Sequence, residues 1–297
     1  MESIVLREIE SPRRLLLALA HPDDESFGPA GTIIHYARQG VAVHDVCGTR
    51  GEAGKVDPEL LVGYGSLADL RTEELLCAAR HLGLAGLHFL DYHDSGMEGT
   101  PENQNPASLL QAPLEEVAGK ITGLIRQIRP QVVVTHDPVG GYFHPDHIKM
   151  HQATLEAFQA AGDPGRFPEQ RAQGLVPYQP QKLYYTTFPR GLFKLLARIL
   201  PLLGQDPEAV GENHDMNVKR MAELDQALTT RIGIRPYYRG RQDAAHCHAS
   251  QTGGHGGWVI GLMARLIRFD WFTRAVPPFT DGRVERDLFA GISGVDH

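Results

Sequence analysis

The sequence predicts an α/β protein: a Rossmann-like, mainly parallel sheet with helices on both faces. Short apolar runs alternate with segments of helical periodicity, which is typical of βαβ units. The runs are apolar throughout rather than at every second residue, as expected of strands that are covered on both sides. Hydrophobic residues make up 42% of the 297 residues and charged residues 22%, so the chain can bury a large core.

The alternation is regular between residues 14 and 160. Strands are predicted at residues 14–20, 41–47, 87–90 and 131–135. Helices are predicted at residues 28–39, 66–82, 113–128 and 145–160, with glycine or proline close to the end of the first three.

After residue 161 the alternation weakens. A Pro/Gly-rich link at 161–180 precedes a predicted strand at 182–188, and helical stretches are predicted at 190–202, 215–230 and within 240–267. We therefore predict a Rossmann-like catalytic core over residues 1–180. Residues 181–297 either complete the same domain or form a small cap on it.

The charge and the cysteine content limit which binding partners and which cellular compartment are expected. The net charge of −7 and the pI near 6.1 indicate no basic surface, which disfavours nucleic acid and anionic membranes. No apolar run near the start is long enough to span a bilayer. The three cysteines form no CxxC pair, so a disulfide framework is not expected and a cytoplasmic location fits. For the apolar segment 192–204, a packed helix or a contact in a homo-oligomer is favoured over contact with a membrane.

Polar segments follow the first and fourth predicted strands. The first reads HPDDE (21–25) and the second reads HDPVGGYFHPDH (136–147). Open parallel sheets bind ligands beyond the carboxyl ends of their strands, where the strand order reverses. In the commonest strand order these two strands are neighbours, so we expect the two segments to face each other.

These segments contain imidazole and carboxylate side chains, which are the usual nitrogen and oxygen ligands of a catalytic zinc. Such a site needs three protein ligands and one open position for water. His21, one aspartate of the pair Asp23 and Asp24, and one histidine of the pair His144 and His147 would supply the three. The spare carboxylate and the spare histidine could then serve as the base and the acid of a hydrolysis.

Three other interpretations fit less well. A dinucleotide-binding domain would show GxGxxG after the first strand, where this chain has three carboxylates that would repel a pyrophosphate. A serine hydrolase would show GxSxG, which is absent from the sequence. Aspartate and histidine also occur as helix caps, but two such motifs at neighbouring strand ends are hard to explain by capping.

The motifs AHPDDE and GGYFHPDH resemble those of the LmbE/PIG-L family of zinc-dependent de-N-acetylases. Smaller segments extend the resemblance over most of the chain: TRGEAG (49–54), Arg71, DSGM (94–97) and HASQ (248–251). The family often has a lysine near its C-terminal motif where this chain has Arg241, which puts only that outer contact in doubt.

The resemblance implies a role for each matching residue. It implies that the zinc ligands are His21, Asp24 and His147. It makes Asp23 the general base and His144 a positively charged second catalytic group, oriented by Asp146, while Tyr142 polarises the amide carbonyl. It implies that the substrate is contacted by Glu52, Arg71, Asp94 and His248.

The implied activity is removal of the N-acetyl group from an N-acetylglucosaminide, of the GlcNAc-inositol or GlcNAc-malate type, with release of acetate and a free amine. The alternatives are a zinc amidase of another N-acyl substrate, such as a glycopeptide, and a sugar-binding protein without activity. A pure binder would need neither Asp23 nor His144, which argues against the last.

Overall fold

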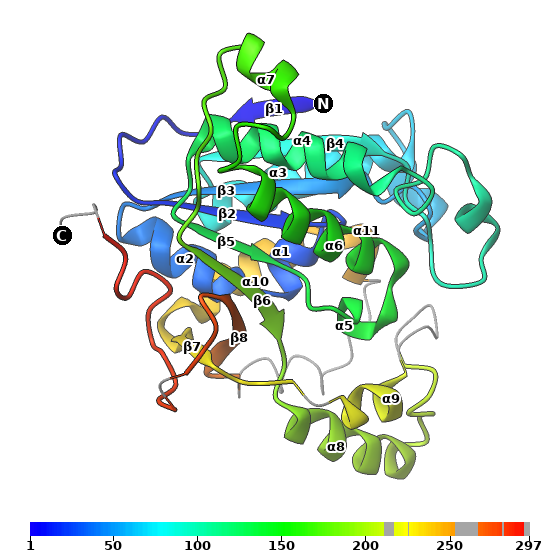
Figure 1. Cartoon of the computed structure of the whole chain (residues 1–297). Coiled ribbons are helices and arrows are strands. Elements are labelled where there is room, and N and C mark those ends of the chain that lie inside the picture. Colours follow the sequence, from blue (N-terminus) through cyan, green and yellow to red (C-terminus); the bar gives the residue numbers. More distant parts are fainter. Residues whose placement is uncertain (211–216, 225, 253–266, 281, 294–297) are drawn as a thin grey trace.

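The structure is a computed structural model, and it describes residues 1–210, 217–224, 226–252, 267–280 and 282–293. One eight-stranded sheet organises these residues, in the order β1-β4-β3-β2-β5-β6-β8-β7 (Figure 1). The strands are β1 (Glu2–Val5), β2 (Arg14–Leu19), β3 (Ala42–Thr49), β4 (Gly86–Tyr92), β5 (Val132–Thr135), β6 (Lys182–Thr187), β7 (Thr230–Gly233) and β8 (Phe269–Val276).

The centre of the sheet is parallel and its edges are antiparallel. Strands β4, β3, β2, β5 and β6 pair in parallel, whereas β1 pairs antiparallel with β4, β8 with β6, and β7 with β8. The parallel pairing of β2 with β5 confirms that the first and fourth predicted strands are neighbours. The α/β class and the mainly parallel sheet are likewise confirmed.

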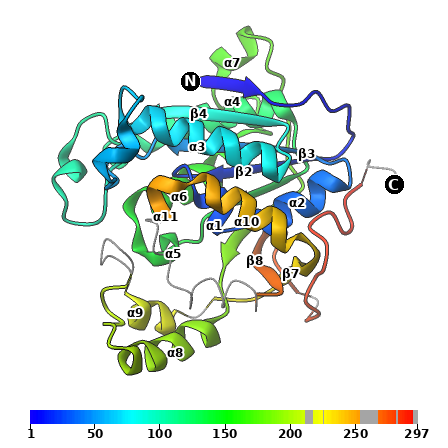
Figure 2. The ribbon, with the colours of Figure 1, turned by 180° about the vertical axis from the view of Figure 1, so that it is seen from behind.

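Helices cover both faces of the sheet (Figure 2). Helices α2 (Ala30–Arg38), α3 (Leu67–Leu82) and α10 (Tyr238–Cys247) pack on one face with Leu15, Leu17 and Leu19 of β2. On the other face, α4 (Leu114–Ile128) and α6 (Pro145–Ala160) pack with Leu16 and Ala18. Successive residues of β2 therefore enter two different cores, which explains its unbroken apolar run.

The remaining helices are short or lie at the rim. They are α1 (Asp24–Phe27), α5 (Gly140–Phe143), α7 (Pro168–Ala172), α8 (Arg190–Ile199), α9 (Val218–Glu223) and α11 (Ala249–Thr252). Four 3₁₀ turns are also described: Pro58–Leu61, Pro101–Gln104, Leu200–Leu203 and Arg235–Tyr237.

The C-terminal part differs most from the prediction. In the described part of the segment 215–230, where one helix was expected, the structure shows the short α9 and the start of β7 at Thr230. Strand β8 was not predicted; its buried side chains include Asp270 and Arg274, which hide the apolar alternation of a strand. Within 240–267 the structure shows α10 and α11, and residues 253–266 lie outside the described residues. Strands from both sides of residue 180 share one sheet, while the boundary itself stays a prediction.

A disulfide joins α3 to α10, which corrects the expectation from the cysteine count. Cys77 and Cys247 are bonded with their Cα atoms 5.8 Å apart, although 170 residues separate them in sequence. Only the packing of the two helices brings these cysteines together, so no local sequence motif predicts the disulfide. The third cysteine, Cys47, is buried and free.

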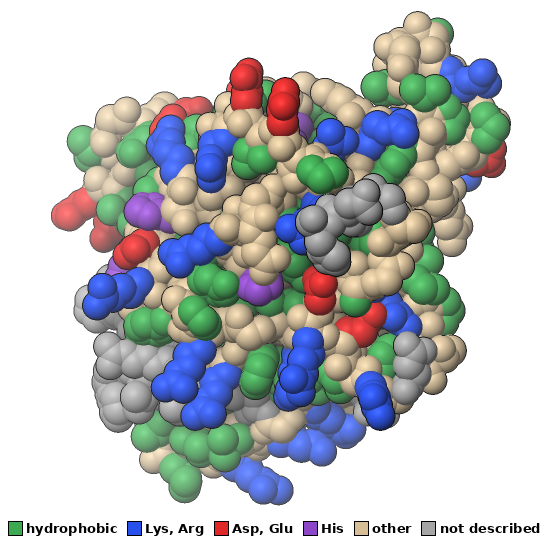
Figure 3. Space-filling model, turned by 90° about the vertical axis from the view of Figure 1, so that its left-hand side faces the viewer, with side chains coloured by type: hydrophobic (Ala, Val, Ile, Leu, Met, Phe, Trp, Pro, Cys, Tyr) green, Lys and Arg blue, Asp and Glu red, His purple; other side chains and the backbone are tan. Residues whose placement is uncertain are grey.

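The surface around α8 carries basic and apolar side chains together. Arg190, Lys194 and Arg198 lie on this helix, and Leu195 is half exposed. Figure 3 shows Lys and Arg side chains over the lower half of one face and hydrophobic side chains at its lower edge. The overall negative charge is therefore unevenly distributed. Among the described residues, no helix has the length and apolar character needed to cross a bilayer.

Candidate metal centre

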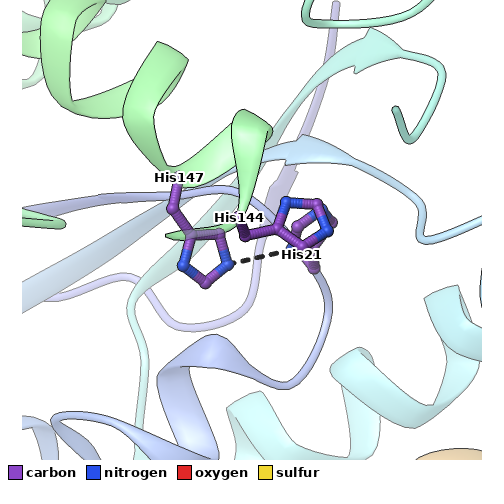
Figure 4. A group of neighbouring side chains, drawn as sticks. All are labelled: His21, His144 and His147. Carbon is purple, nitrogen blue, oxygen red and sulfur yellow. Dashed lines mark hydrogen bonds between the residues drawn. The ribbon is translucent and has the colours of Figure 1, made fainter. Parts of the chain in front are cut away.

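The two polar segments meet at the carboxyl ends of β2 and β5, as the strand order predicted. His21 follows β2 and Asp24 begins α1, whereas His147 lies in the first turn of α6. Figure 4 shows the rings of His21, His144 and His147 gathered at this edge, with a hydrogen bond joining His21 to His147.

Potential ligand atoms of three residues lie at the spacing that one metal ion requires, if either carboxylate oxygen of Asp24 is counted. The distance between His21 Nδ1 and His147 Nε2 is 3.2 Å. Asp24 Oδ1 lies 3.3 Å from His147 Nε2, and Asp24 Oδ2 lies 3.7 Å from His21 Nδ1. A tetrahedral zinc ion with bonds of about 2.0–2.1 Å places its ligand atoms roughly 3.3 Å apart. The donor types and their spacing therefore fit such an ion.

Local structure fixes these ligands. Asp24 Oδ2 accepts the backbone N–H groups of Ala20 at 3.1 Å and His21 at 2.9 Å, which ties the start of α1 to the end of β2. Pro145 is the first residue of α6, as predicted, and the ring of His144 caps this helix by accepting the Asp146 N–H at 3.2 Å. The cap places His147 one turn into the helix.

His136 also belongs to the site, and the sequence argument gave it no role. Its ring stacks on His147 with centroids 3.8 Å apart, and its Nε2 lies 3.4 Å from Asp24 Oδ2. The side chains at this edge form three overlapping groups of potential ligands, and His136 belongs to the second: His21/His144/His147, Asp24/His136/His147 and His21/Asp94/Asp146. One signal could have identified His136, because it directly follows the fourth predicted strand as His21 follows the first.

The electrostatic field at this edge favours a cation. Burial lowers the pKa of His21, but the nearby carboxylates of Asp94, Asp146 and Asp24 outweigh burial and hold this pKa well above its usual value. Burial lowers the pKa of His147 well below its usual value, so this ring is neutral and keeps a lone pair for a metal. A proton on His21 and a metal ion compete for the same negative site.

Asp23 is held in an unusual backbone conformation beside Asp24. Its φ angle is 125°, a region that residues other than glycine rarely adopt. Its N–H donates to Glu25 Oε2 at 2.9 Å, and its carboxylate accepts from Arg71 Nη2 at 3.1 Å. Burial raises the pKa of Asp23 to about 6, although Arg71 opposes the rise.

Two residues predicted to contact the substrate make buried hydrogen bonds within the protein. The guanidinium of Arg71 is buried, and it donates to the carbonyls of Pro22 at 2.5 Å and Gly51 at 3.0 Å as well as to Asp23. His248 is fully buried, with its Nε2 2.8 Å from Glu25 Oε1. Both side chains therefore hold the segment that contains Asp23 in place, and no sequence motif predicts these tertiary contacts.

Glu52 and Asp94 form a connected pair. The Asp94 N–H donates to Glu52 Oε2 at 3.1 Å, and Asp94 Oδ1 lies 3.6 Å from His21 Nε2. Burial would raise the pKa of Asp94, but the charge and the hydrogen bond of His21 lower it below its usual value. Asp94 is therefore ionised and contributes to the field around His21; its contact with a substrate stays a prediction.

Asp146 is predicted to orient His144, and the contacts that the structure gives its carboxylate are with other residues. The Asp146 carboxylate accepts hydrogen bonds from the backbone and hydroxyl of Ser95, and it lies 3.2 Å from His21 Nε2. Burial, with the nearby charge of His21, lowers the pKa of His144 to about 4. His144 is therefore neutral near pH 7 rather than positively charged, because its ring lies inside the fold. Tyr142 does lie beside it, with ring centroids 5.8 Å apart.

The C-terminal part contributes to a cavity of about 430 Å³ beside α1. Its lining is mainly apolar and includes Phe27, Phe188, Arg241 and Trp271. Phe27 ends the short helix that begins with Asp24, so the cavity adjoins the segment with the potential metal ligands. Residues from both sides of the predicted boundary at residue 180 therefore line the same cavity.

Comparisons of sequence agree with this geometry. Residues 16–158 match the model of the PIG-L family, described as GlcNAc-PI de-N-acetylase. The 1D-myo-inositol 2-acetamido-2-deoxy-α-D-glucopyranoside deacetylase of Thermobifida fusca is 38% identical over 294 residues, which cover 94% of this chain and 99% of the relative. The protein of the same name from Acidothermus cellulolyticus is 36% identical, with 95% and 96% covered.

Comparisons of structure identify the same fold. The N,N'-diacetylchitobiose deacetylase of Pyrococcus horikoshii superposes with a TM-score of 0.61 at 20% identity, covering 91% of this chain and 87% of the other. The 4-carboxy-2-hydroxymuconate hydratase GalB of Pseudomonas putida superposes with a TM-score of 0.58 at 19% identity, covering 91% and 98%. One fold thus serves two reactions, so the reaction must be argued from the site. On its sequence match to relatives over nearly its whole length, the chain belongs to the PIG-L family of de-N-acetylases.

Proposed function

We propose that this chain is a zinc-dependent N-deacetylase that hydrolyses the acetamide of 1D-myo-inositol 2-acetamido-2-deoxy-α-D-glucopyranoside to acetate and a free amine. The observation that carries the reaction is the triangle of His21, Asp24 and His147 with Asp23 next to it. The substrate is proposed from the curated relatives, which carry its name and match this chain over almost their full length.

The proposed zinc ligands are His21, Asp24 and His147. A carboxylate with two imidazoles is a known donor set of catalytic zinc, and it leaves one coordination position open. An ion held there would supply Lewis acidity, which polarises the amide carbonyl and makes water more acidic. His136, stacked on His147, would keep that ring oriented.

Asp23 is the proposed general base. With a pKa of about 6, its carboxylate is mostly ionised at pH 7 and is more basic than an ordinary aspartate. Arg71 holds its carboxylate and Glu25 holds its N–H, so the side chain is oriented before the substrate arrives. Asp23 would take the proton of the attacking water while that water adds to the acetyl carbonyl.

His144 is the proposed hydrogen-bond donor to the developing oxyanion or to the leaving amine. Its Nδ1 accepts the Asp146 N–H, so the neutral ring carries its proton on Nε2. A neutral donor can stabilise negative charge on the carbonyl oxygen as that charge develops. Tyr142 is proposed as a second donor to the same oxygen.

Glu52 and Asp94 remain the proposed sugar contacts, whereas Arg71 and His248 are now proposed as positioning residues for the Asp23 segment. Zinc amidases of other N-acyl substrates, glycopeptides among them, share the required chemistry and are the alternative; acetate release from none of the three sugars tested below would favour them. A cytoplasmic location and a homo-oligomer stay predictions.

Acetate release from three substrates tests the proposal. The zinc-loaded protein is given GlcNAc-inositol, N,N'-diacetylchitobiose and N-acetylglucosaminyl-phosphatidylinositol in detergent, and acetate is measured enzymatically. We expect the highest kcat/KM for GlcNAc-inositol, because a relative named for this substrate matches 94% of the chain. A higher kcat/KM for the lipid-linked or the chitobiose substrate would contradict the substrate assignment, and release from none of them would contradict the deacetylase itself.

A further inference from the structure

A second group of metal-ligand side chains joins α3 to α10, outside the candidate metal centre. Cys77 and His81 are four residues apart on α3 and so share one face of the helix, and Cys247 is the last residue of α10. The two sulfur atoms and one ring nitrogen of His81 all lie within 4.8 Å of one another. His81 is exposed and both cysteines are half-buried, so solvent can reach the group.

The disulfide accounts for the two cysteines but leaves His81 unexplained. Among the described residues, the structure gives the His81 ring no hydrogen-bond or ion-pair partner. A disulfide bond does not require a neighbouring imidazole. Two thiolates and one imidazole, in contrast, are a donor set that selects zinc and related soft cations.

We propose that reduction of the Cys77–Cys247 bond creates a second metal site, in which Cys77, Cys247 and His81 bind one divalent cation of the zinc class. Reduction by a dithiol transfers two electrons and two protons to the pair, and the dithiol becomes its own disulfide. Each cysteine then releases its proton when the cation binds. Three protein ligands leave a fourth position for water.

The site keeps the same two helices joined under reducing conditions. Cys247 directly precedes His248, whose Nε2 lies 2.8 Å from Glu25. Ser250, three residues after Cys247, donates from its N–H and its hydroxyl to Glu74 of α3 at 2.7 and 2.6 Å. A disulfide or a bound cation therefore fixes the end of α10, which holds the segment next to Asp23.

Cadmium binding tests this site separately from the candidate metal centre. Coordination of Cd²⁺ by thiolate gives a charge-transfer absorption in the ultraviolet, and the other centre has no cysteine ligand. The protein is reduced with a phosphine, which has no thiol to compete, and is titrated with Cd²⁺. We expect the band to saturate at one thiolate-bound ion per chain, to persist in Cys47→Ala, and to vanish in Cys77→Ser, in Cys247→Ser and in the oxidised parent.

His81→Ala is the deciding variant, because this exposed residue can be replaced without disturbing the core. We expect it to weaken Cd²⁺ binding at least about tenfold. His246→Ala is the matched control: His246 is exposed and adjacent to Cys247 but is not part of the group, so its loss should leave the affinity unchanged. Absence of the band in the reduced parent, or an affinity unchanged by His81→Ala, would overturn the proposal.

Discussion

Replacement of Asp23 by asparagine is expected to lower kcat by about 10²–10⁴, the usual contribution of a general base. Asparagine keeps the shape of the side chain and can still accept a hydrogen bond from Arg71, but it cannot take a proton from water. The metal ligands are untouched, so the metal content should remain close to that of the parent. Acetate release and metal content per chain, measured on the same preparation, check both parts.

Asp24→Asn is the matched control for this change, because it alters the neighbouring carboxylate in the same way. Asp24 approaches both His21 and His147, so its loss should weaken metal binding, and added zinc should restore part of the activity. If Asp23→Asn lost the metal and Asp24→Asn retained it, the two roles would have to be exchanged.

His147→Ala is expected to remove metal and activity together. The residue belongs to two of the three overlapping ligand groups, and its Nε2 lies 3.2 Å from His21 Nδ1 and 3.3 Å from Asp24 Oδ1. Loss of one ligand in three should lower metal affinity by more than about 100-fold, since even residues that only support a ligand are worth 10–100-fold. Dialysis against a zinc buffer followed by elemental analysis measures this affinity.

His144→Ala tests whether His144 is a metal ligand or the proposed hydrogen-bond donor to the substrate. His144 lies in the same group of rings, but we assign it to the substrate, so this variant should keep its metal and lose turnover. Metal loss in His144→Ala as complete as that in His147→Ala would place His144 among the ligands and exclude the proposed assignment.

The sequence was sufficient to predict the centre of the sheet and the meeting of the two motifs. Apolar runs such as residues 14–20 belong to strands covered on both faces, and the strand order then follows from the commonest parallel topology. Strand β8 was not predicted because Asp270 and Arg274 point inward. There Asp270 accepts a hydrogen bond from the N–H of Thr32, and Arg274 forms an ion pair with Glu285. Burial of paired polar residues removes the pattern by which strands are recognised.

The sequence could not predict which residues each side chain of the site contacts. Arg71 and His248 carry the polar character of substrate contacts, yet each is buried against the Asp23 segment by elements distant in the chain. The neutral state of His144 follows from its burial, which only the fold reveals. The Cys77–Cys247 bond likewise depends on how α3 packs against α10.

Anomalous diffraction from crystals of the zinc-loaded protein, measured on both sides of the zinc absorption edge, tests the central claim most directly. The account predicts a peak about 2.0–2.2 Å from a ring nitrogen of His21, a ring nitrogen of His147 and a carboxylate oxygen of Asp24. A peak at this edge of the sheet that is ligated instead by His144, by His136, or by Asp94 and Asp146 would contradict it.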